Sequence, residues 1–224
     1  LALGLSDQVN AMNHQAAFAG DLAYQVNDSL KLGLLAGQLY EQSTFLDNTG
    51  EGAFGFRNDS STDFASLYAA LQVMPNINLF GRYSVGRTDA SKVRSPLMHS
   101  FSDIKSDSFA LGLAVNGLLS KKTSRYQDHL MLTVSQPMRI SSGSVVTDVP
   151  VGRTVDGEVI RESERLGLSP SGREIRAKAS YVVQAEDKSS VQVVGQVRFQ
   201  PDHKKDAESE TILGRPQYKA YFPV

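Results

Sequence analysis

Large apolar residues recur at every second position through most of this chain, and small or polar residues fill the positions between them. The pattern is clearest over 109–116, where the large members are Phe109, Leu111, Leu113 and Val115. Successive side chains of a strand point to opposite faces, so a period of two predicts strands with two different faces. We therefore expect an all-β protein.

Short and long polar links alternate between the expected strands. Short links lie at 27–29 and 75–76, and long ones at 41–63 and 87–108. Outer-membrane barrels have short turns on the periplasmic side and longer loops outside. We predict one domain over 1–224, an antiparallel up-and-down transmembrane β-barrel of about ten to twelve strands. Its last strand, at 218–222, is expected to pair with its first, at 1–6.

The stretch 144–168 fits this pattern less well. Residues 145–149 alternate, but 158–168 carries charged residues on both faces of any strand it forms. A basic residue facing lipid at the bilayer midplane costs about 2–4 kcal/mol. We expect either a strand whose polar part lies outside the bilayer or a hairpin folded over the barrel.

Composition excludes several classes of function. The formal net charge of -1 gives no reason to expect a nucleic-acid partner. Cysteine is absent, which rules out disulfides, thiolate metal sites and cysteine nucleophiles. No apolar run is long enough for a transmembrane helix, whereas a membrane strand needs only about 9–11 alternating residues. The chain opens directly in strand-like sequence, and we expect it to be the C-terminal fragment of a longer chain.

Two motifs that suggest chemistry have simpler explanations. Residues 50–55 match the glycine pattern of dinucleotide-binding loops, but loop-like sequence follows them where that motif needs a helix. The histidines are scattered without metal-ligand spacing, and no nucleophile-elbow pattern is present. We expect no catalytic residue, no cofactor and no metal ion.

A set of charged residues alternates with the apolar positions of the strands and would point into the lumen of a barrel. These lumen-facing candidates are Asp21, Lys31, Arg82, Arg176, Lys178 and Arg198. In a soluble sheet the same residues would form a solvated face.

Two stretches carry a resemblance to a known family. Residues 135–143 read Ser-Gln-Pro-Met-Arg-Ile-Ser-Ser-Gly, and residues 168–174 read Leu-Ser-Pro-Ser-Gly-Arg-Glu. Both resemble motifs in the C-terminal region of bacterial autotransporter-type serine peptidases of the subtilisin family, in the same order. The residues that carry the resemblance are Gln136, Pro137, Arg139, Gly143, Pro170, Gly172, Arg173, Glu174 and Tyr181.

This resemblance implies a barrel in the outer membrane of a Gram-negative bacterium that anchors and translocates an N-terminal secreted protease passenger. The implied partners are the lipid bilayer, the passenger and the barrel-insertion machinery. The sequence departs from the family where Phe222 is followed by two more residues, and tryptophan is absent. We expect Arg139 and Arg173 either to pair with carboxylates such as Asp148 or Glu174 or to be surface charges.

The alternative belongs to another class of protein. It is a soluble β-sandwich or barrel module appended to a secreted subtilisin-like protease, acting in binding or stabilisation. The charged residues of 158–165 favour this alternative.

Overall fold

The computed structural model describes residues 2–10, 15–41, 59–90, 97–119, 126–185, 189–214 and 217–219. These residues form two antiparallel sheets, and the remaining regular structure among them is a short 3-10 turn, η2 (Pro201–His203). The prediction of an all-β, antiparallel protein is confirmed.

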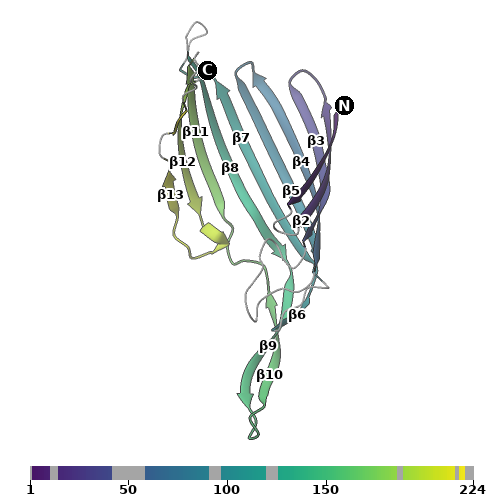
Figure 1. The fold of residues 1–224 in the computed structure, drawn as a ribbon. Helices are drawn as coiled ribbons and strands as arrows, with labels where there is room; N and C mark the ends of the chain where they lie inside the picture. The colour runs from purple at the N-terminus through teal and green to yellow at the C-terminus, as the bar shows by residue number, and fades with distance from the viewer. Residues whose placement is uncertain are drawn as a thin grey trace.

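The larger sheet has eleven strands, and its neighbours follow chain order closely (Figure 1). The order is β1, β2, β3, β4, β5, β7, β8, β11, β12 and β13, and β14 also pairs with β12. The strands are β1 (Ala2–Asn10), β2 (Gln15–Gln25), β3 (Leu30–Glu41), β4 (Ser60–Met74), β5 (Ile77–Asp89), β7 (Ile104–Asn116), β8 (Tyr126–Ser142), β11 (Ile175–Ala185), β12 (Ser190–Phe199), β13 (Glu210–Leu213) and β14 (Gln217–Lys219).

The smaller sheet has three strands in the order β10, β9, β6. They are β6 (Met98–Phe101), β9 (Ser144–Arg153) and β10 (Val159–Gly167). Figure 1 shows the β9–β10 hairpin extending away from one end of the large sheet. Of the two alternatives expected for this segment, the hairpin does form, but it does not fold over the large sheet (Figure 1); a polar part outside the bilayer stays a prediction. Every residue of β10 is exposed, which suits its charged side chains.

Several strands extend further than the apolar alternation predicted. β4 begins at Ser60 and β7 at Ile104, inside segments expected to be links, and β1 continues to Asn10. Polar side chains stabilise some of these added strand residues. The hydroxyls of Thr62 and Thr88 lie 2.8 Å apart, within hydrogen-bond distance, across β4 and β5. Such hydrogen-bonded cross-strand pairs stabilise a sheet without apolar packing.

The first residue of β1 and strand β14 lie toward the same end of the large sheet. Ala2 of β1 pairs with Ala23, close to the short link that follows β2, and β14 pairs with the first residues of β12. Among the described residues β14 pairs with β12, so the predicted pairing of the last strand with the first is not among the observed pairs. Residues 220–224 lie outside the described residues.

A small apolar core lies where the hairpin joins the large sheet. Ala90, Phe101, Ile104 and Val145 are buried together, and Ile140 and Leu168 are among the partly buried residues that pack against them. Gly143 lies beside this core with φ of 152°, and a Cβ there would be 3.0 Å from Ile104. The core therefore connects the two sheets through strands β6, β7 and β9.

Replacing Ile104, which is fully buried, by alanine should loosen the root of the hairpin. An Ile→Ala change in a packed core costs about 2–5 kcal/mol because transfer free energy is lost and a cavity remains. Limited proteolysis should then cut the hairpin faster. The matched control, Ile160→Ala, removes an exposed side chain of the same hairpin, and equal cleavage of both variants would contradict this assignment.

Candidate functional site

The strand register places all the lumen-facing candidates on one face of the large sheet. A row is here a line of directly paired residues that crosses the sheet from strand to strand. Lys31 pairs with Ala70, and this row continues through Phe80, Gly112 and Thr133 to Lys178. The neighbouring row of the same face begins at Tyr68 and contains Arg82, Arg176 and Arg198. Asp21 belongs to the next row, with Ser66 and Ser84. The register thus places these charges on one face of the sheet, and that this face encloses a lumen stays a prediction.

The opposite face is apolar and uncovered. Its leucine and valine side chains remain exposed: Leu67 is 64% exposed, Leu111 59% and Val193 49%. These apolar rows extend from the short links toward the end that carries the hairpin. There a charged row takes over, in which Asp63 pairs with Arg87 and Arg87 with Lys105. The apolar side chains of this sheet therefore form a bounded band and not a dry core.

Aromatic side chains lie over glycines on the polar face. Tyr68 extends across Gly33 on the adjacent strand, and its hydroxyl donates a hydrogen bond to Asp21 Oδ1 at 2.8 Å. Phe80 covers Gly112 in the same way, since a Cβ at Gly112 would lie 2.0 Å from the ring. Glycine is needed at these positions because it leaves room for a ring from the next strand.

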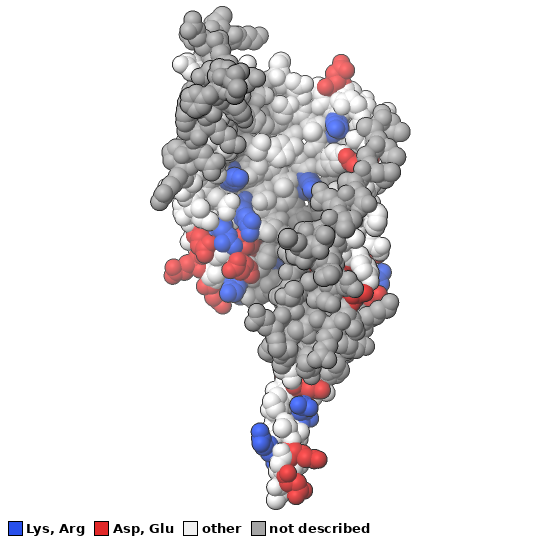
Figure 2. Space-filling view, viewed as in Figure 1, with Lys and Arg blue, Asp and Glu red and all other residues white. Residues whose placement is uncertain are grey.

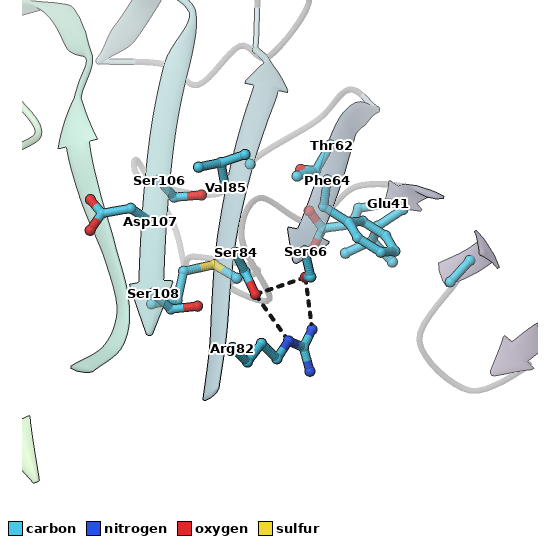
Figure 3. A pocket seen from close by; sticks show the side chains of 14 residues that line it. Glu41, Thr62, Phe64, Ser66, Arg82, Ser84, Val85, Ser106, Asp107 and Ser108 are labelled. Atoms are coloured by element: carbon cyan, nitrogen blue, oxygen red, sulfur yellow. Dashed lines mark hydrogen bonds between the residues drawn. The ribbon is translucent and has the colours of Figure 1, made fainter. Parts of the chain in front are cut away.

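A hollow on the polar face is lined by hydroxyl groups and by Arg82 (Figure 3). The Arg82 Nε donates to Ser84 Oγ and its Nη2 to Ser66 Oγ, each at 3.0 Å, and the two serines bond to each other at 2.7 Å. Arginine has five N–H donors, so this arrangement leaves donors directed away from the serines. Phe64, Leu39 and Met138 are among the apolar residues that line the same hollow.

An ion-pair cluster lies at the hairpin end of this face. The buried Glu174 carboxylate accepts hydrogen bonds from Arg198 at 2.8 and 3.1 Å, from Arg176 Nε at 2.5 Å and from the Asp202 backbone N–H at 2.8 Å. Arg198 also binds Asp202 at 2.9 Å and Glu210 at 2.8 Å. The hydrogen bond from Arg198 is the largest cause that lowers the Glu174 pKa to about 2.

The two family-like motifs meet at the same end. Arg139 Nε donates to the Gly172 carbonyl at 3.0 Å, and Arg139 Nη2 donates to the Pro170 carbonyl at 3.2 Å. The expectation of a carboxylate partner for Arg139 was therefore wrong, because backbone carbonyls of the second motif take that place. Arg173 is exposed and donates its backbone N–H to Gln200 Oε1 at 2.8 Å.

The other motif residues have structural contacts. Buried Gln136 donates through Nε2 to Asp107 Oδ2 at 2.8 Å. Pro137 lies at an irregularity in the β7–β8 register, between the pairs of Gln136 and Arg139. Tyr181 donates its hydroxyl hydrogen to Asp128 Oδ2 at 2.8 Å. Sequence reasoning missed the contact between the two motifs because nothing in the order of residues reveals that the links converge.

The described histidines take part in local hydrogen bonds. His129 Nδ1 lies 2.6 Å from Asn116 Oδ1, and His203 Nδ1 accepts the Glu174 backbone N–H at 2.9 Å. Within the ranges that the structure describes, acidic residues and histidines form no group able to hold a metal ion. His14, the His99 side chain and the glycine motif at 50–55 lie outside the described residues.

No family model, characterised protein or solved structure matches this chain. In the part of the chain that the structure describes, no helix has the length and apolar character needed to cross a membrane.

Gly172→Ala should push the link at 168–174 away from the link at 201–205. A Cβ at Gly172 would lie 2.6 Å from the backbone nitrogen of Lys205 and 2.8 Å from the backbone carbon of Lys204. Since backbone atoms cannot rotate aside, we expect about 1–3 kcal/mol of overpacking strain, seen as faster hydrogen exchange over 168–174 and 201–205. Gly167→Ala is the control, because nothing lies within 4 Å of its Cβ; equal exchange in both variants would refute the contact.

Glu174→Gln should change how stability depends on pH. The Glu174 pKa is lowered from 4.5 to about 2, so its ion pairs stabilise the fold above about pH 4.5 and are lost as the pH falls toward 2. The variant should be less stable than the native chain at pH 7, and this difference should shrink below pH 4.5. Urea unfolding at several pH values measures this difference in the free energy of unfolding. Glu208→Gln, at an exposed position, should leave the profile unchanged, and a constant difference down to pH 2 would contradict the role of Glu174.

Proposed function

We propose that the large sheet closes into a β-barrel in a bacterial outer membrane and serves as anchor and translocator for an N-terminal passenger. The observation that carries this proposal is the uncovered apolar face opposite a polar, charged face. Leu111 and Val193 remain about half exposed in the folded chain, and soluble monomers rarely expose contiguous apolar patches of this extent. Lipid covers such a face in a barrel.

The boundaries of the apolar face support a membrane-spanning band. The apolar rows begin next to the short links and give way to the charged row of Asp63, Arg87 and Lys105 near the long links. Exposed tyrosines stand on the same face, among them Tyr24, Tyr40 and Tyr83. Charge beyond an apolar band is typical of membrane barrels, whereas Tyr83 lies within the apolar rows and Tyr40 lies beyond the charged row.

Closure of the sheet follows from the cost of unpaired edges. Among the described residues β1 pairs with β2 alone and β13 and β14 with β12 alone, and in lipid each unpaired N–H or C=O group at a sheet edge costs several kcal/mol. Pairing of the terminal strands would satisfy these groups and enclose the polar face as a lumen. The short links would then lie on the periplasmic side, and the β9–β10 hairpin outside the cell.

The mechanism is physical, with no bond made or broken. The enclosed wall carries hydroxyls, glycines and charges, so an extended or helical passenger segment could cross the membrane in contact with polar groups. The family resemblance of the two motifs favours a serine peptidase as the passenger. Barrel-insertion machinery would place the closed sheet in the membrane, where it would retain the passenger.

The second candidate, a soluble module appended to a secreted protease, is favoured by the hairpin. β10 is exposed along its whole length and carries Arg161, Glu162, Glu164 and Arg165. These residues suit water and require no membrane. The hairpin, however, belongs to the small sheet, and it leaves the apolar face of the large sheet uncovered.

Adjacent residues of β8 distinguish the two functions. Leu132 is on the apolar face and Met131 on the polar face, and they are 40% and 36% exposed. In a lipid-embedded barrel Leu132→Arg should cost about 2–4 kcal/mol, whereas Met131→Arg, the matched control, should cost little. Detergent-extracted protein should show heat-modifiable migration on a gel, reduced in the first variant only. Equal behaviour of both variants, or a native chain that folds and stays soluble without detergent, would refute the barrel.

A further inference from the structure

We propose that the polar face forms an anion-selective ion path. This inference rests on the proposed barrel, because it requires the face to enclose a lumen. It goes beyond the role of anchor and conduit, because it says that small anions pass through the lumen more readily than small cations.

Cations without carboxylate partners lie along the wall. Among the described residues no ion pair is formed by Lys31, Arg82 or Lys178, and the guanidinium of Arg82 is held by serine hydroxyls instead. All three are exposed on the polar face. They belong to two neighbouring rows of that face, which cross the sheet from β3 to β11.

The carboxylates of the same face are fewer along this stretch, and Asp21 has a hydroxyl group, not a cation, as its partner. Asp21 accepts the Tyr68 hydroxyl, and Glu41 is fully buried at the last position of β3. Glu174 and Glu210 belong to the cluster around Arg198, which lies at the hairpin end of the face. Figure 2 shows blue side chains on the wall in view, while most red ones lie toward the hairpin end. Among the described residues, the wall between the short links and that cluster therefore carries more cations than carboxylates.

A positive wall enclosed by a low-dielectric sheet attracts anions and repels cations. Field lines from the fixed charges concentrate in the lumen because the lipid and the sheet around it polarise little. Rings of lysine and arginine produce anion preference in other pores by this effect. The end cluster adds no positive charge, because its two cations, Arg176 and Arg198, face the three carboxylates of Glu174, Asp202 and Glu210.

The test is ion selectivity of the full 224-residue chain in planar bilayers under a potassium chloride gradient. The reversal potential should give a chloride-to-potassium permeability ratio severalfold above 1. The double variant Lys31→Glu/Lys178→Glu reverses two wall charges that make no hydrogen bond or ion pair with any described residue. Its ratio should fall to 1 or below.

The matched control is Arg161→Glu/Arg165→Glu, which changes net charge equally on the exposed hairpin. Its ratio should equal that of the native chain. Heat-modifiable migration is measured on the same preparations, so that a failure of the barrel is seen separately. A heat-modifiable protein that conducts cations preferentially, conducts no ions, or keeps its selectivity in the wall variant would overturn anion selectivity while the barrel stands.

Discussion

The backbone hydrogen-bond register of the large sheet is the constraint on which the two faces depend. Side chains alternate strictly along each strand, so a slip of one residue would exchange every apolar and polar position of that strand. The observed partners keep Leu34 beside Leu67 and Leu67 beside Tyr83, with Ser66 beside Ser84 on the other side. Apart from the irregularities of the β4–β5 and β7–β8 pairs, this register sorts the sheet into an apolar face and a polar face.

On the polar face, small residues leave room for aromatic rings and hold an arginine side chain in place. Gly33 and Gly112 leave space for the rings of Tyr68 and Phe80, which lean onto the neighbouring strand. The hydroxyls of Ser66 and Ser84 fix Arg82 without neutralising it. The face thus carries glycines, hydroxyls and charged groups at positions that a sandwich core would fill with aliphatic side chains.

The hairpin end is organised by a different set of contacts. Arg139 joins the end of β8 to the link at 170–172, and Glu174 joins that link to η2 and β12. The small core around Ile104 completes the attachment. The β9–β10 hairpin lies in sequence between the two motifs that bind each other, which explains how a long excursion of the chain stays anchored to the sheet.

The sequence by itself determined the all-β class and the approximate positions of most strands of the large sheet, because a period of two is a local property of the chain; it predicted neither β6 nor β13. It did not determine that β9 and β10 leave the large sheet, that β4 and β7 start early, or that Arg139 binds backbone carbonyls. Those features depend on contacts such as Thr62 with Thr88 and Arg139 with Pro170. Only the tertiary structure decides which distant segments meet, because the alternation along one strand carries no information about its partner.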